Sequence, residues 1–287
     1  MSAIRRRRPK KEKRPAAIIR FAWRMGYQPG RVMREVLEWI EVLAVAGALA
    51  AIIMIFITVR MHVPTGSMIP TIDPRDSFFV DRITYYFRDP VPGNIVVFRH
   101  TDQVLVQRVL PDSPAETAGV EEGKELYRLN SFYVHTKVLA ESDLASIPAG
   151  TQLWLLATDG SEYDLGPKPD GAESFGDLGI TLRENRMRYV KRLIAVGGQT
   201  IQIVDGDLYV DGVRLDGEDF DRDYIANSRY HRFGVEPTLV PEGHYFMLGD
   251  NSGNSLDSRY WGFVDDRDII GVPYLRVWPL NRFGIMR

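Results

Sequence analysis

The sequence predicts a mainly β fold preceded by one N-terminal membrane helix. Beyond residue 60, short apolar runs alternate with turn signals, which is the pattern of a β-rich domain. In QIVDGDLYVDG, Asp205-Gly206 supplies the positive-φ residues of a tight hairpin turn. Residues 190–287 contain no amphipathic pattern long enough for an ordinary helix. The candidate strands are 77–83, 94–98, 188–196, 200–204, 207–212, 244–249 and 268–278.

The charge of the chain is unevenly divided. Although the formal net charge is -2, residues 1–34 hold twelve Lys or Arg residues and a single acid. This predicts a basic tail over 1–38 that lies beside anionic membrane lipid, followed by an acidic folded body. A nucleic-acid-binding arm is the alternative for the basic run. The apolar segment that follows explains the charge without nucleic acid as a partner.

An uncharged run, VLAVAGALAAIIMIFITV, occupies residues 42–59. At about 1.5 Å per residue it is close to the thickness of a bilayer core, so we expect a transmembrane helix over 39–60. The Lys and Arg residues before it predict a single-pass protein of the cell membrane with a cytoplasmic N-terminus and an extracytoplasmic body. A buried core helix is an alternative, although core helices are rarely apolar on every face. A cleaved signal peptide explains the run less well, because no A-x-A-like cleavage site follows it.

The sequence changes character between Phe98 and Arg188. The stretch VQRVLPDSPAETAGVEEG (106–123) resembles the strand-turn-helix core of a bacterial PDZ domain, and GTQLWLLATDGSEYDL (150–165) resembles its terminal hairpin. We therefore expect an α+β, PDZ-like module over 102–185, inserted between the two parts of the β domain, 61–101 and 186–287. The resemblance implies an extended peptide ligand whose carboxylate is held by backbone amides. The carboxylate loop of that family normally precedes the first of these pieces, and this chain departs from that order; the stretch 176–182 is the candidate for the loop in a rearranged order. An irregular β insertion without a ligand is the alternative.

Four motifs carry the polar side chains of interest. They are PTGSMIPTI (64–72), PGNIVVF (92–98), RYVKRLIAVGGQTI (188–201) and GDNSGNSLDSRYWGFV (249–264). Period-two alternation places Tyr189, Lys191 and Leu193 on one face of a strand, so the lysine is expected among apolar neighbours. Taken singly, a serine after a glycine is usually a loop serine, and a strand lysine usually faces solvent. The order of the motifs after one membrane span is what favours chemistry.

These motifs, in this order, resemble the bacterial type I signal peptidase family. The resemblance implies a signal-peptidase-type β catalytic domain that removes signal peptides from exported preproteins after small residues, through an ester on Ser67. Two positions depart from the family pattern, Asn94 for Asp and Ser252 for Arg. The implied roles are Ser67 as nucleophile, Lys191 as general base, Thr65 in the oxyanion hole, Ser255 on the lysine amine, Asp257 and Arg259 as a supporting pair, and Val63, Met68 and Val190 at the substrate pocket.

The chemistry sets one physical requirement. A serine hydroxyl is a weak nucleophile until a neighbouring base takes its proton, and a lysine serves as that base only if burial lowers its pKa. No cofactor or metal is expected, because the chain has no cysteine and its five histidines lack ligand spacing. A self-cleaving repressor-type peptidase also uses a Ser/Lys pair and is one alternative. A catalytically silent peptide-binding scaffold is the other.

Overall fold

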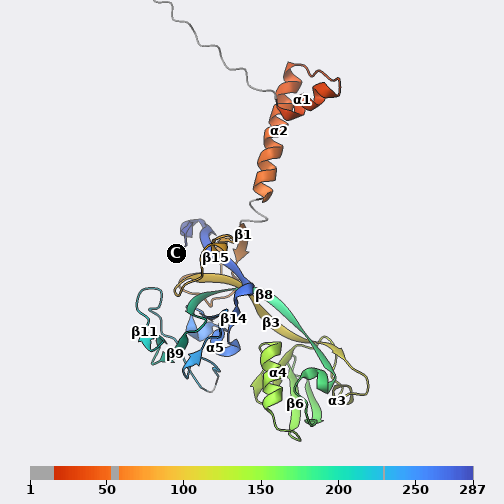
Figure 1. Cartoon of the computed structure of the whole chain (residues 1–287), viewed down its shortest axis with the longest axis vertical. Coiled ribbons are helices and arrows are strands. Elements are labelled where there is room, and N and C mark those ends of the chain that lie inside the picture. The colour runs from red at the N-terminus through yellow and green to blue at the C-terminus, as the bar shows by residue number, and fades with distance from the viewer. Residues whose placement is uncertain (1–15, 53–57, 229, 287) are drawn as a thin grey trace, which may run out of the picture. The chain divides into compact units, whose positions relative to one another are not determined.

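The computed structural model describes residues 16–52, 58–228 and 230–286, in two compact units that divide after Thr58 (Figure 1). The first unit contains helix α1 (Ala17–Arg24) and helix α2 (Arg31–Ile52). The Glu41 carboxylate on α2 accepts hydrogen bonds from the backbone N–H groups of Ala17 and Ile18, at 2.9 and 2.7 Å. Glu41 therefore satisfies donors at the start of α1 that have no partner within that helix.

No helix of the described residues is both long and apolar enough to cross a membrane. Helix α2 begins at Arg31, and all of its charged residues precede Val42. Residues 53–57, which belong to the predicted span 39–60, lie outside the described residues. Strand β1 begins at Thr58, so the last three residues of that range are strand rather than helix. Their backbone groups pair with β2 in a sheet.

The second unit is mainly β, which confirms that part of the predicted fold class. It contains an eight-stranded sheet of order β1-β2-β15-β3-β8-β13-β14, with β16 on β15, and two four-stranded sheets of order β11-β10-β9-β12 and β5-β4-β6-β7. The strands are β1 (Thr58–His62), β2 (Ser77–Asp81), β3 (Ile95–Val109), β4 (Leu126–Leu129), β5 (Phe132–Tyr133), β6 (Gln152–Ala157), β7 (Glu162–Pro167), β8 (Ile180–Val196), β9 (Thr200–Val204), β10 (Asp207–Val210), β11 (Val213–Arg214), β12 (Thr238–Leu239), β13 (His244–Leu248), β14 (Val264–Asp265), β15 (Ile269–Trp278) and β16 (Gly284–Ile285). The short helices are α3 (Pro114–Thr117), α4 (Lys137–Ser146), α5 (Ser258–Trp261), η2 (Thr84–Tyr86), η3 (Phe175–Leu178), η4 (Ser252–Asn254), η5 (Asp266–Asp268) and η6 (Leu280–Arg282).

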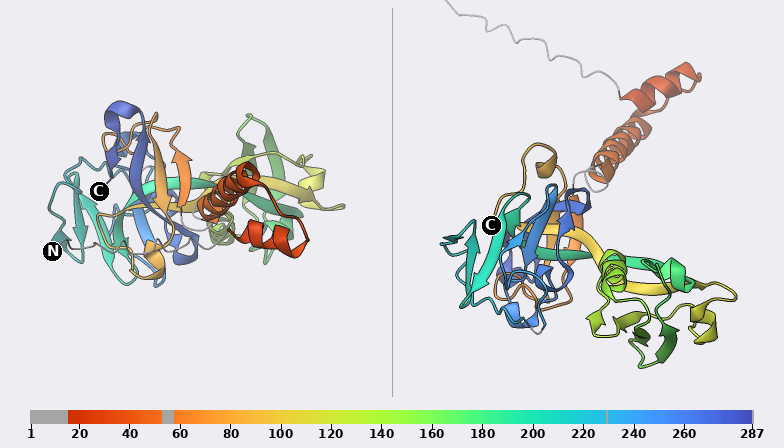
Figure 2. Two further views of the ribbon diagram at one scale, coloured as in Figure 1. Left: turned by 90° about the horizontal axis from the view of Figure 1, so that it is seen from above. Right: turned by 60° about the horizontal axis from the view of Figure 1, so that its bottom comes forward.

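Strands β3 and β8 form a long antiparallel ribbon that leaves the large sheet and leads into the segment 102–185 (Figures 1 and 2). Their pairing runs from Ile95 opposite Arg192 to Val109 opposite Ile180. Both strands are longer than the sequence predicted. Residues 183–188 of β8 are mostly polar and largely exposed, so this part of the ribbon lacks the apolar alternation that reveals a half-buried strand.

The segment 102–185 has an apolar core of its own, built from buried residues between Val104 and Leu182. The predicted short helix is present as α3, whose N-cap Ser113 accepts a hydrogen bond from the Glu116 N–H at 3.2 Å. The predicted hairpin is formed by β6 and β7. Helix α4 was not predicted. Its Asp143 side chain pairs with Arg232, at 2.6 Å, and so ties the segment to the rest of the second unit.

Candidate active site

The amine of Lys191 donates a hydrogen bond to the hydroxyl of Ser67 at 2.7 Å. Lys191 lies on β8, and Ser67 lies in the turn that follows β1. Both residues are buried, with 2% and 6% of their surfaces exposed. The predicted pair is thus brought together at the distance that proton transfer requires.

The loop after β13 holds the serine turn in place. The backbone N–H of Asn251 donates to the Ser67 carbonyl at 3.0 Å, and its side-chain amide donates to the Gly66 carbonyl at 3.0 Å. Gly249 passes so close that a Cβ there would lie 2.2 Å from the Ser255 hydroxyl and 2.5 Å from the Ser67 carbonyl oxygen. The sequence predicts a dense turn at Gly249 and Asn251 but assigns neither residue a role.

Burial lowers the pKa of Lys191 to about 8. Removal of the amine from water is the largest cause, since it disfavours the charged form. The Asp257 carboxylate acts in the opposite direction, and the Arg259 guanidinium lowers the pKa further. A substantial fraction of the amine is therefore neutral near physiological pH, as a general base requires.

A cavity of about 560 Å³ opens beside the two residues. Among the predicted residues, Val63, Thr65, Val190 and Ser255 line it together with Ser67 and Lys191. The Thr65 hydroxyl lies 3.5 Å from the Ser67 hydroxyl. The other lining residues are Met61, Pro64, Asp102, Met187, Arg188, Tyr189, Gly253, Asn254, Leu256 and Tyr260. Of these, only Tyr189 had been singled out from the sequence.

Met68 does not line this cavity, which corrects its predicted place at the substrate pocket. Its side chain is fully buried in an apolar cluster that also contains Val63 and Val190. Ser255 does line the cavity, but its buried hydroxyl has no hydrogen-bond partner among the described residues. The predicted bond between Ser255 and the lysine amine is therefore absent from this structure.

Asp257 and Arg259, which do not line the cavity, form a fully buried ion pair. Two nitrogens of the guanidinium each donate to one carboxylate oxygen at 2.8 Å. The carboxylate also accepts hydrogen bonds from the backbone N–H groups of Gly249, at 3.1 Å, and of Arg259, at 3.3 Å. Arg259 also donates to the Ser252 hydroxyl at 2.7 Å, and that hydroxyl accepts the Ile225 N–H at 2.8 Å. Ser252, the departure from the family pattern, therefore serves as a buried link in this network.

A second buried ion pair was missed from the sequence. Arg192, next to the lysine on β8, donates to both carboxylate oxygens of Asp250 at 2.8 Å. The Thr71 hydroxyl donates to the same carboxylate. Asp250 thus joins β8, the loop after β13 and the serine turn. The sequence signal for this pair is the period-two alternation of side chains along β8. It places Lys191 and Arg192 on opposite faces of the strand.

The described residues contain no group of three or more His, Asp or Glu side chains arranged to hold a metal ion. The arrangement at the site offers a buried hydroxyl, an amine of lowered pKa within hydrogen-bond reach, and an adjoining cavity. Such a pair supports nucleophilic catalysis by the serine.

The sequence matches the family described as signal peptidase, peptidase S26, over residues 36–278. It is 26% identical to a probable signal peptidase I-2 of Synechocystis sp., over 86% of this chain and 77% of that protein. It is likewise 26% identical to a probable signal peptidase I-1 of Synechocystis sp., over 86% of this chain and 85% of that protein. A signal peptidase I of Mycobacterium tuberculosis is 28% identical, over 91% of this chain and 79% of that protein.

Proposed function

Because this chain belongs to the signal peptidase I family of S26 serine peptidases, whose substrates are preproteins that bear signal peptides, we propose that Ser67 and Lys191 perform its reaction. The observation that carries the proposal is the 2.7 Å hydrogen bond between the buried amine and the hydroxyl. Preproteins that end their signal peptide in small residues are the proposed substrates, since Val63 and Val190 leave a shallow apolar wall beside the serine.

In this mechanism the neutral amine of Lys191 takes the proton of the Ser67 hydroxyl as its oxygen attacks the scissile carbonyl. The Thr65 hydroxyl and the Ser67 N–H stabilise the oxyanion. Lys191 then gives the proton to the departing amine and later removes a proton from the water that hydrolyses the ester. Substrate binding brings the Ser255 hydroxyl onto the lysine amine, which fixes the direction of the amine. Asp257 and Arg259 hold the loop that carries Ser255.

The test is the incubation of the purified full chain with a preprotein whose signal ends in A-x-A, followed by mass analysis of the new N-terminus. We expect Ser67→Ala to abolish cleavage while the protein stays folded. The matched control is Ser131→Ala, an exposed serine in the segment 102–185. Persistent cleavage by Ser67→Ala would contradict Ser67 as the nucleophile. If the protein were a catalytically silent scaffold, the wild type would not cleave the preprotein either.

We further propose that residues 42–59 anchor the protein in a membrane once, with the N-terminus in the cytoplasm. The uncharged run, the basic residues before it and the membrane association of signal peptidases support this. The chain has no cysteine, so single cysteines report topology cleanly. In intact cells an impermeant maleimide should label Ser131→Cys and spare Ser2→Cys until the membrane is opened. Labelling of the two in the reverse order contradicts the proposal.

The segment 102–185 is proposed to be PDZ-like and to bind an extended peptide. Support comes from α3, the β6–β7 hairpin and the turn at Gly179 that precedes β8. In addition, β8 pairs with β3 over residues 180–192, whereas its recorded pairing with β13 covers only 192–196. Among the described residues, no strand is recorded on the other edge of β8 over 180–191. A peptide could add as a strand along that edge. Peptides with a free C-terminus should bind more tightly than the same peptides amidated. Equal binding of both forms contradicts the carboxylate site.

A further inference from the structure

A cavity of about 390 Å³ lies where the segment 102–185 meets the rest of the second unit. Its volume falls in the range of about 300–1,000 Å³ that is usual for ligand pockets. Tyr260 lines both this cavity and the catalytic one, so the two share a side chain. Both parts of the chain contribute to its wall, among them Tyr133, His135, Asp143, His231, Arg232 and Tyr260.

Aromatic rings in contact lead along this cavity. The Tyr133 ring is stacked on His135 with centroids 6.1 Å apart, and His135 meets Tyr260 edge-on at 5.9 Å. Tyr260 in turn contacts His231 at 4.8 Å. At the other end, Tyr133 contacts Tyr127 of β4, which is 43% exposed, at 5.3 Å. These five rings form an aromatic row that connects the surface of the segment 102–185 with the wall of the catalytic cavity.

The cavity offers no unpaired charge to a ligand. Asp143 and Arg232, the ionised residues of its lining, pair with each other at 2.6 Å. Burial lowers the pKa of His135 to about 4 and also lowers the pKa of His231, so both imidazoles are neutral near physiological pH. The lining therefore favours an uncharged aromatic group, because rings at such separations attract one another.

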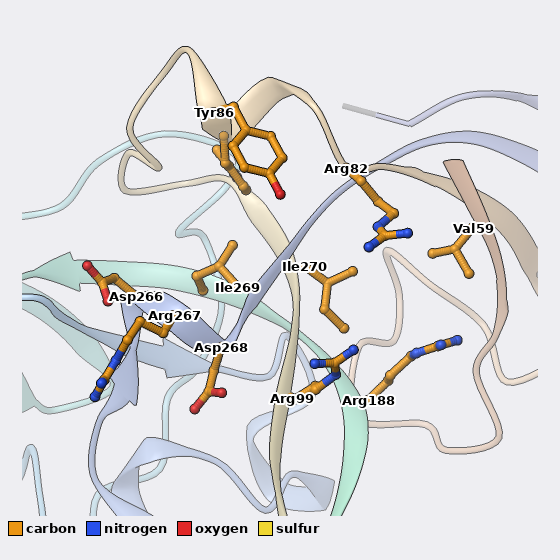
Figure 3. Close-up of a pocket in the computed structure, with 11 residues that line it drawn as sticks. Val59, Arg82, Tyr86, Arg99, Arg188, Asp266, Arg267, Asp268, Ile269 and Ile270 are labelled. Atoms are coloured by element: carbon orange, nitrogen blue, oxygen red, sulfur yellow. The ribbon is translucent and has the colours of Figure 1, made fainter. Parts of the chain in front are cut away.

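A second neighbour of the catalytic cavity differs in chemistry. This cavity, of about 370 Å³, shares Arg188 with the catalytic one and is lined by four arginines and two aspartates (Figure 3). An uncharged ring placed there would take water from charged groups without giving them a hydrogen bond, which is costly. An aromatic group that leaves the catalytic cavity is therefore better bound beside Tyr260.

Two walls of the catalytic cavity lie on opposite faces of the large sheet. Val63 and Val190 belong to one apolar cluster, whereas Tyr260 packs against another that contains Leu193 and Trp261. Because side chains alternate along β8, Val190 and Leu193 point to opposite faces. The small residues before the scissile bond are proposed to lie against Val63 and Val190. The chain after the bond is then the part that reaches Tyr260.

We propose that this cavity binds an aromatic side chain from the mature part of the preprotein, a few residues after the scissile bond. The bound ring packs against Tyr133, His135 and Tyr260, and the chain that carries it follows the aromatic row. The inference rests on the proposed function and adds to it a selectivity for the sequence that follows the signal peptide. The segment 102–185 thereby takes part in substrate binding.

The experiment uses preproteins that share one signal ending in A-x-A and differ only near the cleavage site. In the reference substrate, Ser and Gly occupy the first positions after the scissile bond. Each test substrate carries a single Phe, moved through this stretch one position at a time, and a second series places the Phe before the A-x-A residues. We expect Phe in a narrow window after the bond to raise kcat/KM of the purified full chain about tenfold, equivalent to ~1.4 kcal/mol. The gain appears mainly as a lower KM, because the contact is made equally in the bound substrate and in the transition state.

Variants of one cavity residue test where the Phe binds. Tyr133→Ser should bring the ratio of kcat/KM between the Phe and reference substrates close to one. Tyr133→Phe keeps the ring and should keep the wild-type ratio, which guards against an effect of folding. Tyr274→Ser is the matched control, because Tyr274 is 38% exposed against 37% for Tyr133 and lines neither cavity. It should also keep the wild-type ratio.

Equal kcat/KM for the Phe and reference substrates at every position overturns the inference and leaves the proposed reaction intact. A preference that survives Tyr133→Ser unchanged overturns this cavity as its site. A preference found only before the scissile bond overturns the assignment to the mature part. If the wild type cleaves none of the substrates, the proposed function fails and the inference fails with it.

Discussion

Lys191 and Ser67 are 124 residues apart in the chain, yet the lysine amine lies 2.7 Å from the serine hydroxyl. Lys191 is buried and its amine has a lowered pKa, while the serine borders a cavity. The separation of the two residues along the chain includes the whole segment 102–185. The β3–β8 ribbon returns the chain from this segment to the sheet and so delivers the lysine to the serine.

The first prediction concerns pH. Because the Lys191 pKa is about 8, kcat/KM of the free enzyme should rise with pH and level off above that value. Lys191→Met should abolish this rise of kcat/KM with pH and lower the activity about 10²–10⁴-fold. A profile that stays flat between pH 6 and about 9, near the cited pKa, contradicts the lysine as base.

The same pKa predicts how stability depends on pH. Between pH 8 and the ordinary lysine value of 10.5, the unfolded chain keeps a proton that the folded protein has lost. The contribution of Lys191 to the free energy of unfolding therefore rises with pH across this window, and its full destabilising effect is present below it. Urea unfolding at several pH values should show a smaller slope in this window for Lys191→Met than for the wild type.

Ser255→Ala separates a positioning role from a structural one. The Ser255 hydroxyl is buried without a recorded hydrogen-bond partner among the described residues, so its removal should change the free energy of unfolding by less than about 1 kcal/mol. If the hydroxyl directs the lysine amine in the substrate complex, kcat should nevertheless fall, with a shift in the pH profile. An unchanged kcat and an unchanged profile would remove Ser255 from the mechanism.

Gly249→Ala tests the close approach at the serine turn. The added Cβ would lie 2.2 Å from the Ser255 hydroxyl and 2.5 Å from the Ser67 carbonyl oxygen, so the loop must move. We expect a loss of stability of about 1–3 kcal/mol, typical of overpacking, and a larger fall in kcat than in substrate binding. Gly284→Ala, where a Cβ meets no atom within 4 Å, is the control and should be near neutral.

In the buried Asp257–Arg259 pair, loss of one charge should be costly because the other charge then stays buried without its partner. Asp257→Asn leaves the guanidinium buried without its counter-charge and should cost about 3–5 kcal/mol, measured by urea unfolding. Replacement of both residues, Asp257→Asn with Arg259→Met, should cost less than the sum of the single changes. Additive losses would mean that the two side chains do not act as a pair.

The strands were the most predictable part of the fold. Residues 200–204 were predicted as a strand with the bounds of β9, because polar and apolar residues alternate from Thr200 to Ile203 and a hairpin turn follows. The ribbon was predicted only in part, since Arg99 on β3 and Arg186 on β8 interrupt the apolar pattern. Helix α4 was missed because its apolar residues do not gather on one face, and its burial is decided by packing inside the segment 102–185.

By itself, the sequence determined the mainly β fold and the uncharged run, because these follow from local periodicity and composition. The pairing of a serine with one lysine was implied by the resemblance of the motifs and their order to a known family. The tertiary structure alone decided that Met68 lies in the core, that Asp250 pairs with Arg192 and that Arg99 stands opposite Arg188. Contacts of this kind depend on strand register and on the path of loops. Register is fixed by the packing of the whole sheet, and no short stretch of residues encodes it.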